Sequence, residues 1–244
     1  MNPITKSSSN YTKKKSRVIK YIIIHYTGMS SASKSLSWLC NKNSKVSCHY
    51  FIDEKGKLFQ LVDDVNIAWH AGISSWGKDR NLNKNSIGIE IQNKGEDLSY
   101  HKFSSKQIKE TIELIIFLKQ KYSILDCNIL GHSDVAPDRK TDPGYLFPWD
   151  KLNKFGIGLM PGKIKVSRTL LQVNLIKKTQ KLLKDFGYRI NLTGLLDIQT
   201  ILVLNSFQSH YCQNEIGQFD YNSSIIVKLR DLISQKNRCL TSEY

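Results

Sequence analysis

The sequence predicts an α/β fold followed by a small domain of three helices. Three short, strongly apolar runs at residues 18–25, 86–92 and 127–130 are typical of strands that are buried on both faces of a sheet. A capping-box pattern begins at Ser104, and isoleucines follow it at helical spacing, which predicts a helix over a sheet face. The 244 residues, 40% of them hydrophobic, are enough for one large domain and one small one.

The N-terminal half contains an arm and the first strands. Residues 1–17 are rich in Ser, Asn, Thr and Lys, and we expect a flexible basic arm there. Next comes the strand at 18–25, which ends in His25. We then expect a short helix at 33–41 and a hairpin whose strands, 46–52 and 57–62, are joined by a glycine-containing turn.

The second half contains the remaining strands and the helices. The strand at 86–92 carries Glu90 between two isoleucines, the predicted helix runs to about Tyr122, and the strand at 127–130 leads into the loop Gly131–Gly144. Glycine and proline residues near position 160 predict a domain boundary. The expected units are an arm at 1–17, a first domain at 18–160 and a helical domain at 166–237, whose helices cover about 175–186, 198–211 and 223–234.

Two segments together predict a metal site. The loop Gly131–Gly144 contains His132, Lys140 and Asp142, and His25 stands at the carboxyl end of a buried strand. Imidazole and carboxylate groups are zinc ligands, and three protein ligands leave one tetrahedral position open for water. We therefore expect one Zn²⁺ per chain, held by His25, His132 and Asp142.

Glu90 and Lys140 are the candidate catalytic residues. A carboxylate within a buried strand is costly unless it is paired or functional, so Glu90 is a candidate general base and acid. The ammonium group of Lys140 would stabilise a tetrahedral oxyanion. The alternatives are an ion pair across the sheet for Glu90 and a solvated loop position for Lys140.

Five segments resemble the zinc-dependent N-acetylmuramoyl-L-alanine amidases of the type 2 amidase family, in the order in which that family carries them. They are His25–Thr27, Ser47–Tyr50, Ala68–Gly72, Asn85–Glu90 and Gly131–Gly144. The resemblance covers roughly residues 18–152. It implies a mixed central sheet flanked by helices and the same zinc ligands and catalytic pair. It also implies hydrolysis of the amide between the lactyl group of N-acetylmuramic acid and the L-alanine of a stem peptide.

The C-terminal segment resembles a peptidoglycan-binding domain of three helices over about residues 169–234. The resemblance is carried by Thr179–Leu183, Phe186–Tyr188, Thr193–Gly194, Asp197 and Phe207–Gln208. The third helix departs from the usual pattern, which puts ligand affinity in question. Such a module would raise the local concentration of substrate.

Several polar and aromatic residues are candidates for substrate contact, with packing as the alternative for each. The candidates are His49, Tyr50, Trp69, His70, Arg80 and Asn85, and we weigh Trp76 and Asn83 in the same way. His101 and His210 are expected to be ordinary surface or helix residues.

The net charge of +15 favours an anionic partner, and peptidoglycan or muropeptides fit it. No motif that interleaves aromatic and basic residues supports a nucleic-acid partner. The scattered cysteines predict free thiols, and no segment has the length or the apolar character of a secretory signal or a membrane span. We expect a cytoplasmic protein, with a periplasmic or cell-wall location as the alternative. A non-catalytic peptidoglycan receptor is the alternative function, and the oligomeric state stays open.

Overall fold

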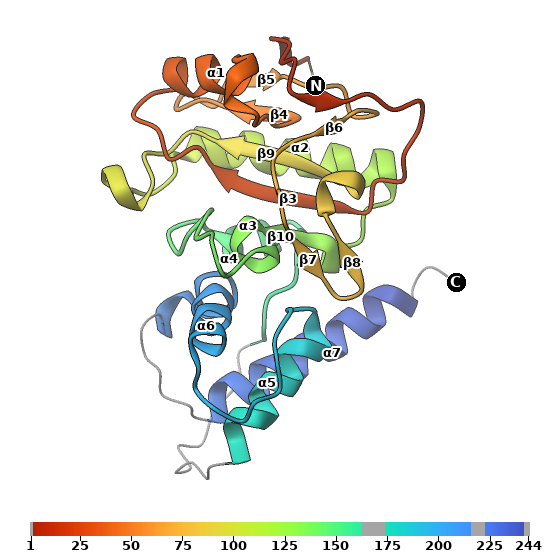
Figure 1. Ribbon diagram of the computed structural model, residues 1–244, viewed down its shortest axis with the longest axis vertical. Helices are drawn as coiled ribbons and strands as arrows, with labels where there is room; N and C mark the ends of the chain where they lie inside the picture. The colour runs from red at the N-terminus through yellow and green to blue at the C-terminus, as the bar shows by residue number, and fades with distance from the viewer. Residues whose placement is uncertain (1, 163–173, 216–222, 242–244) are drawn as a thin grey trace.

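The computed structural model describes residues 2–162, 174–215 and 223–241, and its centre is a six-stranded mixed sheet (Figure 1). The strand order is β1–β5–β4–β9–β3–β10. Neighbouring strands are parallel except for the β4–β5 hairpin. Helices cover both faces of this sheet, which confirms the predicted α/β fold and its mixed sheet.

The six sheet strands are β1 (Ile4–Thr5), β3 (Tyr21–Tyr26), β4 (Tyr50–Ile52), β5 (Leu58–Gln60), β9 (Ser86–Ile91) and β10 (Ile129–Gly131). Two short antiparallel pairs lie outside the sheet: β2 (Tyr11–Thr12) with β6 (Ile67–Ala68), and β7 (Ser75–Trp76) with β8 (Asp79–Arg80). The hairpin and the central strands were predicted, but β4 is shorter than the expected strand at 46–52.

The α-helices are α1 (Ala32–Cys40), α2 (Ser105–Tyr122), α3 (His132–Val135), α4 (Trp149–Asn153), α5 (Asn174–Phe186), α6 (Ile198–Tyr211) and α7 (Ser223–Thr241). Short 3-10 helices lie at η1 (Lys42–Ser44), η2 (Leu82–Asn85), η3 (Glu96–Leu98), η4 (Asp126–Asn128) and η5 (Gln213–Glu215). Helix α7 runs seven residues past the predicted Ser234, and α3 forms inside the segment that was expected to be a loop. None of the helices in the described ranges is long and apolar enough to span a membrane.

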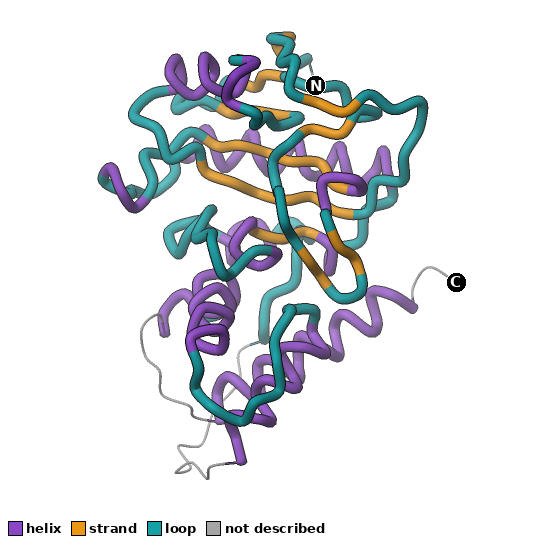
Figure 2. The backbone as a smooth tube through the Cα atoms, in the orientation of Figure 1, coloured by secondary structure: helices purple, strands orange, loops and turns teal. Residues whose placement is uncertain are grey.

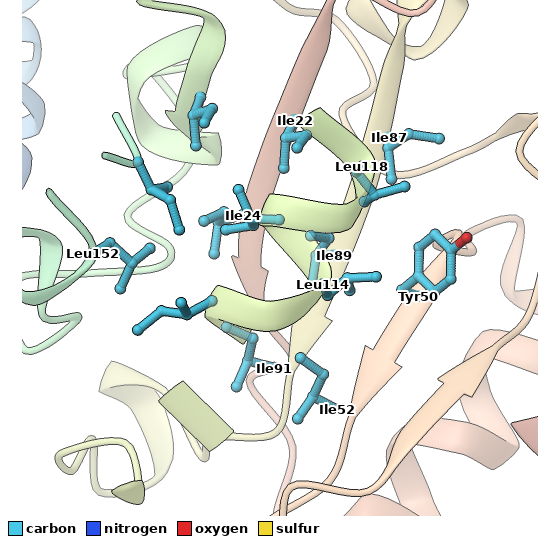
Figure 3. Packing of buried hydrophobic residues seen from close by; sticks show 14 of the residues in the cluster. Ile22, Ile24, Tyr50, Ile52, Ile87, Ile89, Ile91, Leu114, Leu118 and Leu152 are labelled. Atoms are coloured by element: carbon cyan, nitrogen blue, oxygen red, sulfur yellow. The ribbon is translucent and has the colours of Figure 1, made fainter. Parts of the chain in front are cut away.

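Helix α2 covers one face of the sheet (Figure 3). The side chain of Ser104 accepts a hydrogen bond from the Gln107 backbone, and the Gln107 side chain accepts one from the Ser104 backbone, so the capping box is present. Leu114 and Leu118 of α2 pack against isoleucines of β3 and β9. Each fully buried side chain of this kind contributes roughly 1.5–3 kcal/mol.

The alternation of side chains along β3 and β9 separates this core from the polar residues. Successive side chains of a strand point to opposite faces of the sheet. Ile22 and Ile24 join the cluster under α2, which places Ile23 and His25 on the other face. In the parallel register, His25 pairs with Glu90. The sheet therefore presents His25 and Glu90 side by side on the face away from α2.

The N-terminal segment differs from the predicted flexible arm. Strand β1 extends the sheet next to β5, and β2 pairs with β6. The buried side chain of Asn10 donates hydrogen bonds to the carbonyl groups of Asn41 and Val46, and Ser8 donates one to that of Leu39. Backbone pairing and these buried polar contacts fix the segment, although its composition is typical of disorder.

The C-terminal helices share a core with the first part of the chain. One cluster joins Tyr21, Ile23 and Trp76 to apolar residues of α5, α6 and α7. Figure 1 and Figure 2 show α5 and α7 near the β7–β8 hairpin and α6 below α3. The Gly77 amide of the hairpin donates to the Gly187 carbonyl, just after α5, at 2.7 Å. The helical segment therefore packs as a continuation of the sheet's hydrophobic core.

A buried carboxylate also joins the two parts. Asp134 of α3 accepts hydrogen bonds from the Gly131 amide at 2.7 Å and from the Tyr188 hydroxyl at 2.5 Å, and it contacts Nδ1 of His210 at 2.6 Å. His210 is buried and stacks between Trp149 and Tyr211. His210 lies in helix α6, as one of its two expected positions, but it is buried and not at the surface. His101 is exposed as expected.

Candidate active site

Three predicted ligands meet at the carboxyl edge of β3 and β10. His25 is the second-last residue of strand β3, His132 opens α3 directly after β10, and Asp142 lies in the following loop. His25 Nδ1 lies 3.0 Å from His132 Nδ1 and 3.0 Å from Asp142 Oδ2. His132 Nδ1 lies 3.1 Å from the same carboxylate oxygen, and all three residues are buried. Among the described residues, this is the group whose ligand atoms are placed to hold a metal ion.

The geometry of this triad fits a tetrahedral zinc site. With zinc–ligand distances of about 2.0–2.1 Å, two ligand atoms of a tetrahedron are about 3.3 Å apart. The observed 3.0–3.1 Å edges form a nearly regular triangle of similar size. An ion over that triangle would have three protein ligands and one open position, as catalytic zinc sites have.

The electrostatics of the triad favour the protonation states that bind metal. Burial, followed by the neighbouring His132, lowers the pKa of His25 to about 4. Burial alone would raise the pKa of Asp142, but charge interactions and hydrogen bonds with His132 and His25 lower it overall. At neutral pH the triad therefore offers a neutral His25 imidazole and an ionised carboxylate, and deprotonated groups are the forms that coordinate zinc.

Glu90 and Lys140 line the same cleft, which has a volume of about 200 Å³. The Oε2 atom of Glu90 is buried and has no hydrogen-bond partner among the described residues. Burial raises the pKa of Glu90 well above its usual range, Asp142 raises it further, and Lys140 opposes both effects. Since no cross-sheet ion pair of Glu90 occurs in the described segments, the carboxylate is left facing the cleft and available for proton transfer.

Two of the candidates for substrate contact reach the cleft, and four do not. Trp69 and His70 line the cleft. His49 is fully buried below it, where its Nδ1 accepts a hydrogen bond from the Gly88 amide and its Nε2 faces the Arg17 guanidinium at 2.8 Å. The groove-lining interpretation of His49 is therefore wrong.

The other three candidates lie outside the cleft. Tyr50 belongs to the core under α2 and donates its hydroxyl hydrogen to Asp64, because β4 turns that side chain to the opposite face. Arg80 is exposed on the β7–β8 hairpin and donates to the carbonyl groups of Gly77 and Asp79. Asn85 ends η2 and does not line the cleft. These three residues do not line the cleft, contrary to the prediction that they contact the substrate.

Trp76 and Asn83, the other two candidates for substrate contact, make contacts within the fold. Trp76 is buried against Phe186 and Tyr188. The side-chain oxygen of Asn83 accepts hydrogen bonds from the backbone amides of His70 and Ala71 and so fixes the loop under the cleft.

One exposed aromatic residue of the cleft was not predicted. Trp38 of α1 lines it and is 49% exposed. The buried residues of α1 are Ser35, Leu36 and Leu39, so Trp38 lies off their stripe. A large apolar side chain off the buried stripe of an amphipathic helix was the signal in the sequence that could have identified it.

Comparison with known proteins finds relatives that are named as N-acetylmuramoyl-L-alanine amidases. The chain is 39% identical over 161 residues to the N-acetylmuramoyl-L-alanine amidase AmiD of Escherichia coli (strain K12), a match covering 61% of this chain and 57% of that protein. The chain thus spans little more than half the length of the curated relatives it matches.

Solved structures extend the similarity over nearly the whole chain. One is the complex of Escherichia coli AmiD with the substrate anhydro-N-acetylmuramic acid-L-Ala-D-γ-Glu-L-Lys (TM-score 0.77, 29% identity, 91% of this chain and 92% of that chain). Another is AmpDH3 from Pseudomonas aeruginosa in complex with an anhydromuramic pentapeptide (TM-score 0.73, 25% identity, 95% and 96% covered). The sequence model of the N-acetylmuramoyl-L-alanine amidases matches residues 15–145 of the 244. This chain belongs to the N-acetylmuramoyl-L-alanine amidase family.

Proposed function

We propose that this protein is a zinc-dependent amidase that hydrolyses the bond between the lactyl group of N-acetylmuramic acid and the L-alanine of peptidoglycan stem peptides. The observation that carries the proposal is one cleft that combines three converging ligand atoms with a buried carboxylate oxygen of Glu90, which has no hydrogen-bond partner in the described part of the chain. The relatives are named as amidases for this bond, and two structural neighbours were solved with anhydromuropeptides.

The residues of the cleft divide the chemistry among them. Zinc held by His25, His132 and Asp142 would supply Lewis-acid chemistry that polarises the scissile carbonyl and acidifies a water molecule. Glu90 takes a proton from the attacking water as the oxygen–carbon bond forms, and passes it to the alanine nitrogen as the carbon–nitrogen bond breaks. The ammonium of Lys140 stabilises the oxyanion, a contribution of about 3 kcal/mol for one such donor. The products are a lactyl carboxylate and a free α-amine.

Product analysis tests this proposal. Incubation of the protein with a soluble anhydromuropeptide is expected to release the intact stem peptide with a free N-terminal alanine. Mass spectrometry would identify that peptide and the sugar acid, each at the mass that addition of one water to this bond requires. Cleavage within the peptide or the glycan would contradict the proposed bond. Stable binding with no cleavage would favour the non-catalytic receptor instead.

We also propose that the helical domain, at about residues 166–237, contributes to binding of the wall polymer. A groove of about 480 Å³ lies between it and the first domain, lined by Ile73 on one side and by Arg189 and Ile198 on the other. Ile73 and Ile198 are each 77% exposed. Exposed apolar side chains beside a groove are typical of ligand sites.

Truncation of Ile198 tests the role of this groove. Ile198→Ala is expected to weaken sedimentation with insoluble peptidoglycan about tenfold, since loss of a packed aliphatic contact costs about 1.4 kcal/mol. Cleavage of a soluble muropeptide should change much less. Leu240→Ala, at an exposed position of α7 outside the groove, is the matched control. Equal sedimentation of the Ile198 and Leu240 variants would argue against a binding role for the groove.

A further inference from the structure

We propose that His70 and Ser86 are positioning residues that fix the tautomer of His25, so that its Nδ1 lone pair faces the other two ligand atoms of the triad. This inference rests on the proposed function, because it concerns how the chain prepares His25 for a metal ion. The two residues come from different parts of the fold: His70 follows β6, and Ser86 opens β9.

The chain of hydrogen bonds has a fixed direction because it ends at a backbone carbonyl. Ser86 Oγ lies 2.6 Å from the carbonyl oxygen of Leu82, which can only accept, so the serine hydroxyl donates its single hydrogen there. His70 Nε2 lies 3.1 Å from the same Oγ. Since that hydroxyl hydrogen is already used, the hydrogen between His70 and Ser86 must belong to Nε2 of His70.

The hydrogen bond from His70 to Ser86 also decides the direction of the hydrogen bond between His70 and His25. A neutral imidazole carries one hydrogen, so a His70 ring protonated at Nε2 has an accepting Nδ1. His70 is buried, its two ring nitrogens face Ser86 and His25, and it has no carboxylate partner among the residues that the structure describes.

His25 is the last residue in this series of hydrogen bonds. Its Nε2 lies 3.0 Å from His70 Nδ1, and because that atom accepts, Nε2 of His25 is the donor. The Nδ1 atom of a neutral His25 is therefore unprotonated. This is the atom that lies 3.0 Å from both His132 Nδ1 and Asp142 Oδ2.

A single hydrogen bond to a backbone carbonyl fixes His132 in the same tautomer, with its hydrogen on Nε2. His132 Nε2 lies 3.2 Å from the carbonyl oxygen of Ala71, the residue after His70, and the carbonyl requires the hydrogen on Nε2. Both His25 and His132 therefore present an unprotonated Nδ1 atom to the triad. Their partners, the His70 ring and the Ala71 carbonyl, are on adjacent residues, and Asn83 fixes these residues by accepting hydrogen bonds from their backbone amides.

Gly88 provides the space that the His70 ring occupies. A Cβ atom at position 88 would lie 2.4 Å from His70 Cγ and 2.6 Å from its Nδ1. The ring therefore lies directly over the backbone of β9, two residues before Glu90 and opposite Ile23 of β3. Any side chain at Gly88 would push His70 out of line with His25 without altering a hydrogen-bonding group.

Nitrogen-detected NMR of the metal-free protein tests the tautomer directly. The ¹⁵N shifts and couplings of the His25 ring are expected to show a neutral imidazole protonated at Nε2. Protonation of His25 at Nδ1 would overturn the proposal. This measurement requires neither zinc nor substrate, so its outcome is independent of whether the protein proves to be an amidase.

Zinc affinity, measured by competition with a chromogenic chelator, tests the consequence. His70→Phe and Gly88→Ala are each expected to raise the zinc Kd about 10- to 100-fold, and Ser86→Ala is expected to raise it by less. His70→Gln, whose amide can accept from His25 and donate to Ser86, should recover part of the loss. Thr111→Val is the matched control, because it removes a buried hydroxyl that donates to a helical carbonyl far from the triad.

The outcomes separate the two proposals. An unchanged Kd in a folded His70→Phe variant would overturn the positioning role while leaving the amidase function intact. Failure of the wild-type protein to bind zinc or to cleave muropeptides would remove the proposed function, and the NMR result would still decide the tautomer. If a variant fails to fold, the wild-type tautomer and the remaining variants supply the decision.

Discussion

Replacing Glu90 by glutamine is expected to lower kcat for muropeptide cleavage by about 100- to 10,000-fold, the range typical of a lost general acid–base group. Glutamine keeps the size of the side chain but cannot take a proton from water. Because Glu90 is not one of the three triad ligands, the variant should bind zinc with nearly wild-type affinity. Stopped assays of released peptide, together with metal analysis of the same samples, would measure both quantities.

A second carboxylate supplies the control for this prediction. Glu113 is an exposed residue of α2, on the other side of the sheet, and Glu113→Gln should leave kcat unchanged. A Glu90→Gln enzyme that keeps full turnover would exclude Glu90 from proton transfer. Loss of zinc from the Glu90 variant would instead indicate that its carboxylate supports the metal site.

Replacing His210 by alanine is expected to lower the free energy of unfolding by about 3 kcal/mol, the sum of a lost hydrogen bond to a buried carboxylate and a new cavity. The ring contacts Asp134 at 2.6 Å and stacks at 3.7 Å on Trp149 and at 3.8 Å on Tyr211, measured between ring centroids. Urea unfolding followed by circular dichroism would measure the change. His101→Ala, at an exposed position, should change stability by less than about 0.5 kcal/mol.

The His210 variant also tests how the helical segment is connected to the active site. Asp134 lies two residues after the candidate ligand His132 and accepts a hydrogen bond from the Gly131 amide just before His132. Through Asp134, the C-terminal helices therefore hold the segment that places His132. A destabilisation below about 1 kcal/mol would show that the helical segment is only loosely attached to this loop.

The sequence predicted the strands that bring the residues of the candidate site together, because local patterns mark those strands. The β-branched strand that ends in His25 and the apolar strand that carries Glu90 are both recognisable without partners. The capping box of α2 is likewise a local signal, and the helix begins where that signal places it. The direction of the strands and the positions of their ends were enough to predict that His25, Glu90 and the loop after β10 lie close together.

Features that depend on distant partners were not predictable. The partner of His210, Asp134, is 76 residues away in the sequence, and nothing around His210 marks it as buried. Asn10 is fixed by carbonyl groups more than 30 residues away. His49 and Tyr50 failed as predictions for another reason: both faces of β4 are covered, so an alternating pattern does not reveal which side faces the cleft.

Titration of zinc into metal-free protein, with release of stem peptide as the readout, tests whether cleavage depends on one zinc ion at His25, His132 and Asp142. Metal-free protein should be inactive, and activity should rise in proportion to added zinc and level off at about one equivalent per chain, as a single site of three ligands and one open position requires. Full cleavage by protein from which zinc has been thoroughly removed would contradict the account.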